Sequence, residues 1–246
     1  MDKRLDLAVI ESRWWTRRND SVRGVFDMLA GTLAGNPFAY HYEMFNNAES
    51  IKEMIPRIAR TSDIHHIYVA AHGDEQSIYG AGDARISRTV LANALAEVHA
   101  KQIYGVFFGS CLFGWNVDAL MEQSGATWLA GYSEEVDWLH SSAMDLYFWY
   151  AYYQSGASLA ARKTDRAENM LTLLTALLIR VPYLFKELGF RVSVASGNQY
   201  LTFPDDFFDE DSGEPDRDYR ESYNVVLDYI NDHEPGVWPN AQDLRH

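Results

Sequence analysis

The sequence contains a single cysteine, few basic residues and no long hydrophobic run. One cysteine excludes a disulfide within the chain, which fits a reducing compartment. The longest apolar helical stretch, residues 170–179, ends at Arg180, whereas a membrane span needs about 20 apolar residues. The short apolar run near the N-terminus is interrupted by Asp6 and does not resemble a signal peptide. We therefore expect a cytoplasmic protein with no membrane partner.

The charge balance is strongly acidic, because 21 Lys and Arg residues stand against 35 Asp and Glu residues, a formal net charge of −14. No basic stripe interrupts this acidity, and an acidic surface is repelled by nucleic acid, so we expect no nucleic-acid partner. Hydrophobic residues make up 47% of the chain and aromatic residues 14%. This composition is typical of a globular protein with a sizeable core. The sequence leaves the oligomeric state open.

Apolar segments with strand character alternate along the chain with segments of helical periodicity. Strands are expected at residues 5–12, 39–45, 65–73, 103–110, 127–133 and 190–196, and helices lie between them. This alternation predicts an α/β fold, a three-layer α-β-α sandwich with a mainly parallel six-stranded sheet. We expect one domain over residues 1–200. Residues 201–246, which include an acidic stretch, are expected to form an extension that packs on this domain or trails from it.

Two chemically reactive side chains follow neighbouring strands of the predicted sheet. His72 ends the third strand and Cys111 ends the fourth. In a parallel sheet, ligands bind outside the carboxyl ends of the strands. A thiol beside an imidazole forms a thiolate nucleophile, and the protonated histidine then donates its proton to the leaving group. Gly73 lacks a Cβ, so its amide and that of Cys111 are candidates for an oxyanion hole. Taken singly, a buried cysteine or a turn histidine is more often structural.

The segments around these residues, AAHGDE (70–75) and FFGSCLFG (107–114), resemble those of the caspase-like cysteine peptidases. This group includes caspases, metacaspases, clostripain, gingipains and CHAT-type proteases. In the family, the histidine follows the third strand as His-Gly and the cysteine follows the fourth strand. The order of elements from residue 5 to about 196 is similar too. The resemblance implies a caspase-like fold and a cysteine endopeptidase that cleaves a protein or peptide substrate with a His72–Cys111 dyad.

The sequence departs from true caspases in two respects. The Gln-Ala-Cys signature of caspases is replaced by Gly109-Ser110-Cys111, which is closer to the bacterial members. Residues 112–127 are also too few to contain the long cleavable linker of caspases. Maturation by a cut at that position is therefore not expected.

The resemblance places the floor of the substrate pocket in the segment after the fifth strand, residues 131–142. Asp137, with Glu135 nearby, would then bind a substrate arginine or lysine through charge-assisted hydrogen bonds, and Trp138 would wall an adjacent subsite. The alternative is that these acidic residues form a solvated loop. A competing signal is Arg17, with Arg13 and Arg18 nearby, because an arginine in the pocket would favour an acidic substrate residue. We expect a basic residue before the cleaved bond (the P1 residue).

Neither a metal nor a cofactor is predicted. His72, Asp74 and Glu75 lack a second histidine at helical spacing. The acidic stretch at 205–221 lacks the regular spacing of a calcium-binding loop, and GAGDA (80–84) is too short for a dinucleotide fingerprint.

Two other functions stay open. A glutamine amidotransferase or related thiol hydrolase places its cysteine at Gly-x-Cys-x-Gly with the histidine later in the chain. Here Leu112 and Phe113 delay the second glycine, and the downstream histidines are His140, His233 and His246. The other alternative is a catalytically inactive interaction module that retains the fold.

Overall fold

The computed structural model describes residues 4–13, 21–61, 63–97, 103–157, 163–196, 199–209, 214–217, 219–242 and 244. Within these residues the main sheet has seven strands, in the order β10-β9-β8-β7-β3-β1-β2. Their bounds are β1 (Leu7–Ser12), β2 (His41–Phe45), β3 (His66–Ala70), β7 (Gly105–Gly109), β8 (Trp128–Tyr132), β9 (Phe190–Ser196) and β10 (Gln199–Phe203). The first five of these strands run parallel, and β9 and β10 are antiparallel to their neighbours.

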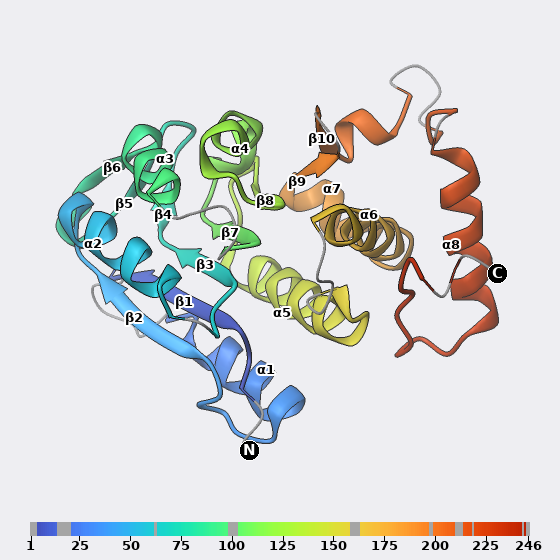
Figure 1. Cartoon of the computed structure of the whole chain (residues 1–246), viewed down its shortest axis with the longest axis horizontal. Coiled ribbons are helices and arrows are strands. Elements are labelled where there is room, and N and C mark those ends of the chain that lie inside the picture. Colours follow the sequence, from blue (N-terminus) through green and yellow to red (C-terminus); the bar gives the residue numbers. More distant parts are fainter. Residues whose placement is uncertain are drawn as a thin grey trace.

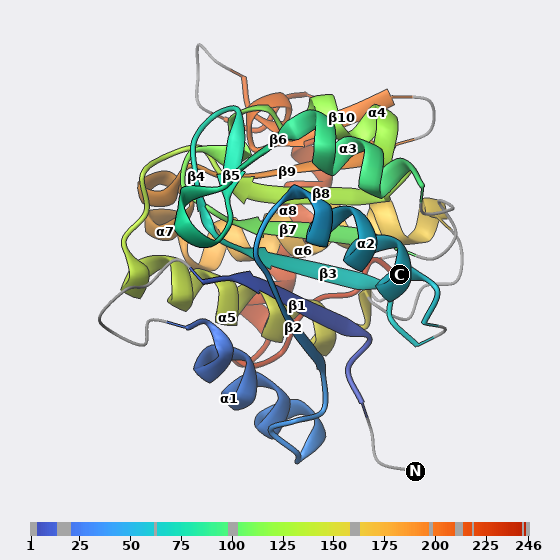
Figure 2. The ribbon, with the colours of Figure 1, turned by 90° about the vertical axis from the view of Figure 1, so that its left-hand side faces the viewer.

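Helices cover both faces of this sheet (Figures 1 and 2). On one face lie α2 (Ala48–Ala59), α3 (Arg88–Ala96) and α4 (Asp118–Ser124). On the other face lie α1 (Arg23–Ala34), α5 (Trp138–Gln154), α6 (Lys163–Arg180) and α7 (Pro182–Leu188). The predicted three-layer sandwich and mainly parallel sheet are confirmed. The predicted strand count of six was wrong, because β10 pairs with β9 as a seventh strand.

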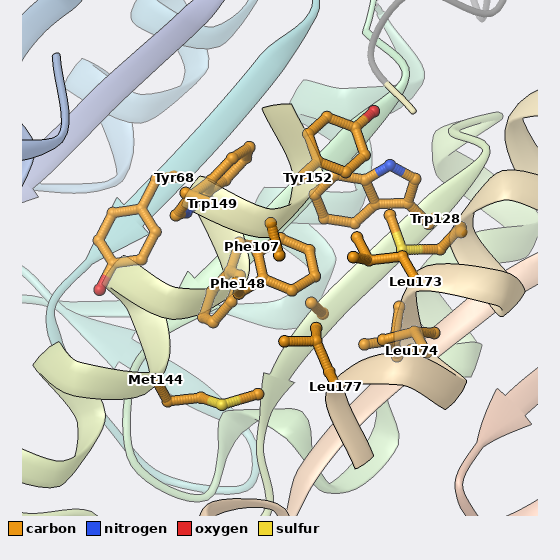
Figure 3. Close-up of a cluster of buried hydrophobic side chains, with 14 of the residues drawn as sticks. Tyr68, Phe107, Trp128, Met144, Phe148, Trp149, Tyr152, Leu173, Leu174 and Leu177 are labelled. Atoms are coloured by element: carbon orange, nitrogen blue, oxygen red, sulfur yellow. The ribbon is translucent and has the colours of Figure 1, made fainter. Parts of the chain in front are cut away.

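The face beneath α5 and α6 is packed with aromatic rings (Figure 3). Phe107 of β7 lies at the centre, with its ring centroid 5.2 Å from that of Phe148 and 5.5 Å from that of Phe190. Such ring pairs contribute about 0.5–1.5 kcal/mol each beyond the burial of apolar area. The strands that lead to His72 and Cys111 therefore pack against a dense aromatic core.

The opposite face of the sheet is mostly aliphatic. Along β7, Phe107 belongs to the aromatic core, whereas Val106 and Phe108 belong to the core beneath α2, α3 and α4. This alternation is the ordinary geometry of a strand. The same alternation places Gly109, the last residue of β7, on the face covered by α1 and α5. Extended two residues further, it places Cys111 on that face as well.

A small antiparallel sheet follows β3 directly. It consists of β4 (His72–Gly73), β5 (Ser77–Tyr79) and β6 (Arg85–Ser87). Only Ala71 separates β3 from β4. His72 is therefore the first residue of the small sheet and pairs with Tyr79 of β5, which fixes the path of the backbone at the histidine.

The described part of the C-terminal region belongs to the same core. The boundary predicted after residue 200 falls inside β10, and Leu201, Phe203, Phe207 and Val226 are buried in the aromatic core. Helix α8 (Arg220–Asp232) packs on the outer side of α6. None of the helices in the described ranges is long and apolar enough to cross a membrane.

Candidate active site

The parallel register of β3 and β7 brings His72 and Cys111 to one edge of the sheet. Ala70 pairs with Gly109 across the two strands, and each of the two candidate residues comes two positions after this pair. A Cβ added to Gly73 would lie 2.9 Å from the carbonyl oxygen of Cys111, closer than Cβ contacts normally allow. The backbone after His72 therefore touches the backbone of Cys111, and a glycine is needed at their contact.

A cavity of about 400 Å³ opens at this edge of the sheet, on the α1 and α5 side. Its lining includes the exposed His72 and the half-buried Cys111. The lining also includes the buried residues Tyr68 and Asp145, which place the inner end of the cavity between β3 and α5. The volume falls in the range of pockets that hold small ligands or single side chains.

The loop that carries Cys111 has an unusual backbone. The next residue, Leu112, has a φ of 57°, a left-handed conformation that costs a leucine about 1 kcal/mol or more. Two backbone hydrogen bonds hold this conformation: the Leu112 amide donates to the Glu134 carbonyl at 3.1 Å, and the Phe113 amide donates to the Cys111 carbonyl at 2.6 Å. The thiol itself lies 3.7 Å from the carbonyl oxygen of Val136. The sharp turn thus directs the thiol toward the segment between β8 and α5.

Arg88, the first residue of α3, connects the loops that follow the two candidate residues. Its guanidinium donates to the carbonyl of Glu75, at 2.6 Å, in the loop after His72. It also donates to the carbonyls of Phe113 and Asn116 in the loop after Cys111. The guanidinium lies 4.1 Å from the centre of the Phe113 ring. One half-buried cation therefore connects both loops to the same helix.

The inner end of the cavity contains a carboxyl group that was not predicted from the sequence. Asp145 of α5 is 3% exposed, and it accepts a hydrogen bond of 2.5 Å from the Tyr132 hydroxyl and another from the Tyr68 hydroxyl. Burial raises the pKa of Asp145 to about 7, although the two phenol donors act in the opposite direction. Helical periodicity could have indicated that Asp145 is buried, because it lies on the same face of α5 as the buried residues Phe148, Trp149 and Tyr152.

Of the residues predicted to form the substrate pocket, one lines the cavity and two lie outside it. Trp138 lines the cavity. Asp137 is not among the lining residues and caps α5 instead, accepting hydrogen bonds from the amides of Leu139, at 2.9 Å, and His140, at 3.1 Å. These backbone bonds hold the pKa of Asp137 below its ordinary value. Glu135 is exposed and outside the lining as well.

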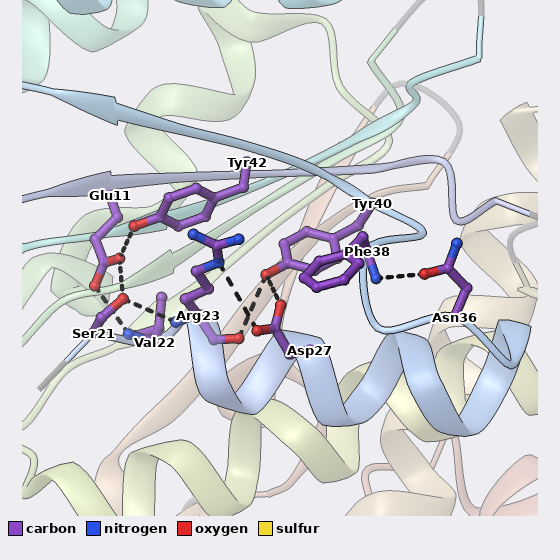
Figure 4. A network of polar contacts seen from close by, with 9 residues as sticks. All are labelled: Glu11, Ser21, Val22, Arg23, Asp27, Asn36, Phe38, Tyr40 and Tyr42. Carbon is purple, nitrogen blue, oxygen red and sulfur yellow. Dashed lines mark hydrogen bonds and ion pairs between the residues drawn. The ribbon is translucent and has the colours of Figure 1, made fainter.

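Of the arginines predicted to compete for the pocket, Arg17 and Arg18 lie outside the described residues, and Arg13 is exposed. A buried acid, Glu11, occupies the end of β1 instead (Figure 4). It accepts hydrogen bonds from the Ser21 hydroxyl, at 2.7 Å, and the Val22 amide, at 2.9 Å. Because Val22 lines the cavity, Glu11 fixes the start of α1 beside the site.

The histidine pair at the start of β3 lies at the opposite edge of the sheet. His66 is fully buried, with its Nε2 at 2.8 Å from the Tyr152 hydroxyl and its Nδ1 at 3.2 Å from a carboxylate oxygen of Asp6. These contacts give His66 a structural role, away from the carboxyl ends of the strands where the cavity opens. Across the part of the chain that the structure describes, no three His, Cys, Asp or Glu side chains are placed to hold a metal ion.

No protein-family model matches this sequence, and no curated protein matches it. Among solved structures, similarity is found to iotapain, a secreted C11 cysteine protease from Bacteroides thetaiotaomicron, with 11% identity over 72% of this chain and 71% of that chain and a TM-score of 0.43. A secreted C11 cysteine protease of the same organism in complex with an irreversible peptide inhibitor gives 11% identity, coverage of 93% and 100%, and a TM-score of 0.39. At this level of similarity, function has to be argued from the residues of this chain.

Proposed function

We propose that this protein is a cysteine endopeptidase of the caspase-like type, in which Cys111 is the nucleophile and His72 the general base and acid. The observation that carries the proposal is the parallel pairing of β3 and β7, which brings both residues to one cavity. The half-buried thiol and the exposed imidazole are both accessible from that cavity.

The proposed reaction is acyl transfer through a thioester. His72 accepts the thiol proton, and the sulfur of Cys111 attacks the carbonyl carbon of the scissile peptide bond. The tetrahedral intermediate collapses, the carbon–nitrogen bond breaks, and the imidazolium donates its proton to the leaving amine. A water molecule, deprotonated by His72, then attacks the thioester, releases the acid product and restores the thiol.

The amide of Gly73 is proposed to donate to the oxyanion together with the amide of Cys111. Asp74 and Ser77 exchange two backbone hydrogen bonds at the start of the β4–β5 pairing. Hydrogen-bonded and non-hydrogen-bonded pairs alternate in an antiparallel ladder, so the Gly73 amide points away from β5. A Cβ at Gly73 would lie 2.9 Å from the Cys111 carbonyl oxygen, so the two backbone segments that carry these amides lie side by side. Removal of one such donor typically costs about 10²–10³-fold in kcat.

We also propose that the P1 residue is basic, as the sequence analysis expected. The support is the acidic balance of the chain and a carboxyl group at the inner end of the cavity. The cytoplasmic location remains a proposal too, and it rests on the free thiol, which persists most readily in a reducing compartment.

A peptide-library cleavage profile tests the function. Wild type is expected to cleave peptides, Cys111→Ala to be inactive, and His72→Ala to lose about 10²–10⁴-fold in kcat/KM, the usual contribution of a general base. His140→Ala is the matched control, because His140 is a half-buried histidine on α5 that does not line the cavity. If His140→Ala removes activity and His72→Ala does not, the assignment of His72 as the general base is wrong. If Cys111→Ala cleaves as wild type does, the peptidase proposal is wrong.

A further inference from the structure

We propose that Asp145 binds the cationic side chain of the P1 residue, and that its protonation state sets how strongly the enzyme prefers that side chain over a neutral one. This inference rests on the proposed peptidase function and identifies the specificity-determining residue of the same cavity.

The shape of the cavity supports this placement. Two small residues, Ala70 of β3 and Gly109 of β7, line the cavity together with Cys111. A Cβ at Gly109 would lie 2.0 Å from the Tyr68 hydroxyl, so the phenol already fills the space beside that glycine. A substrate side chain that enters past Cys111 therefore meets the hydroxyl of Tyr68 and the carboxyl group of Asp145.

The hydrogen bonds of Asp145 leave room for one further partner. Tyr132 donates to one carboxylate oxygen and Tyr68 to the other. Each oxygen has a second lone pair, and a guanidinium donates two parallel N–H groups to such a pair of oxygens. None of the described Lys or Arg residues forms an ion pair with Asp145. A buried carboxylate without a cation is costly, so a substrate cation supplies the charge that the fold does not.

The groups around Asp145 determine how it titrates. Tyr68 faces it from β3 and Tyr132 from β8, and the carboxylate of Glu11 lies beyond Tyr68 at the end of β1. The thiol of Cys111 and the imidazole of His72 share the cavity. Because burial raises the pKa of Asp145 to about 7, the carboxyl group is mostly neutral at pH 6 and mostly ionised at pH 8. Preference for a cation should therefore rise with pH over this interval.

The experiment compares two peptides that differ only at P1, one with arginine and one with its neutral isostere citrulline. The ratio of their kcat/KM values is measured on the full chain between pH 5.5 and 8.5. Any pH dependence of the bond-breaking steps is common to both peptides and cancels in the ratio. In wild type the ratio is expected to rise by up to about 30-fold, the change in ionised fraction for a pKa near 7 over this range.

Asp145→Asn is expected to give a ratio near one that does not change with pH. Asp137→Asn is the matched control and should behave as wild type, because Asp137 caps α5 outside the cavity. Alkylation of Cys111 by iodoacetamide at the wild-type rate verifies that each variant has an intact site. Tyr132→Phe removes a donor that stabilises the ionised form, so the rise in its ratio should move to higher pH.

Two results would overturn the inference. One is a wild-type ratio that stays constant with pH, and the other is a pH-dependent ratio that persists in Asp145→Asn. In both cases cleavage still depends on Cys111 and His72, so the peptidase proposal stands. An absence of Cys111-dependent cleavage of any peptide refutes the function itself, and the inference fails with it.

Discussion

Gly73 is the residue at which the two halves of the candidate site touch. Its missing side chain lets the backbone after His72 approach the carbonyl of Cys111, and its amide points away from β5. The position therefore has a steric requirement and, in the proposed mechanism, a chemical one as well. A change of one methyl group there should affect catalysis far more than folding.

We predict that Gly73→Ala lowers kcat/KM by about 10²–10³-fold, the usual cost of an oxyanion donor that is displaced. The added Cβ would lie 2.9 Å from the Cys111 carbonyl oxygen and push the two loops apart. Gly24→Ala is the control, since a Cβ at Gly24 in α1 has no neighbour within 4 Å. That change should stabilise the helix by about 0.5–1 kcal/mol. Equal activity in both variants would show that Gly73 has no role in catalysis.

At the residue scale, the placement of side chains at strand ends was more predictable than that of side chains on helices. His72 and Cys111 were expected to lie together because each follows a strand, and the sheet register brings both to one cavity. Asp145 was missed because one acid in an apolar stripe resembles an ordinary helix position until the tertiary contacts are known. The left-handed backbone of Leu112 was beyond prediction, since leucine rarely adopts it.

At the scale of elements, the site is assembled where two loops meet the N-terminus of α3. The loop after β4 and the loop after β7 each give a carbonyl group to the guanidinium of Arg88. A planar cation with several N–H donors suits this task, whereas the ammonium of lysine is a point charge. Arg88 is thus a positioning residue for the proposed dyad.

We predict that Arg88→Ala lowers kcat by about 10- to 100-fold with little change in KM, since small displacements of reacting groups are costly to the rate. Arg88→Lys should restore only part of the loss. Arg57→Ala is the control, because Arg57 forms an exposed ion pair with Glu43 on the edge of the sheet, and such pairs contribute about 0–1 kcal/mol. A purely structural role would instead lower the stability of Arg88→Ala and leave kcat of the folded fraction unchanged.

Most elements were predictable, and the exceptions have physical causes. The alternation of strands and helices predicted the sandwich correctly. Strand β10 was assigned to the extension, although the Gly197-Asn198 dipeptide before it is a known hairpin signal. Helix α7 was missed because its seven residues are too few to show helical periodicity, and only Pro182 at its start marks it.

At the scale of the whole molecule, the chain after residue 200 contributes to the main core. Phe203 of β10 is fully buried, and its ring lies 5.8 Å from Phe185 of α7 and 4.9 Å from Phe207. The sheet edge at β9 is therefore covered by the chain itself. The C-terminal region should unfold together with the rest of the protein.

We predict that Phe203→Ala lowers the free energy of unfolding by about 3–5 kcal/mol, the usual cost of a buried phenylalanine. Tyr200→Ala, on the same strand but 42% exposed, should change it by less than about 0.5 kcal/mol. Urea denaturation followed by circular dichroism measures both values. If the C-terminal region were an independent extension, Phe203→Ala would leave the main unfolding transition unchanged.

The central claim is that His72 and Cys111 act on each other, and the alkylation rate of Cys111 measured against pH tests it most directly. Because the chain has one cysteine, incorporation of one label reports this residue alone. We predict that wild type reacts with iodoacetamide at pH 6 to 7 faster than a free thiol of ordinary pKa, near 8.5, and that His72→Ala loses this advantage. A pH–rate profile that is the same in both proteins and follows a free thiol would contradict the claim.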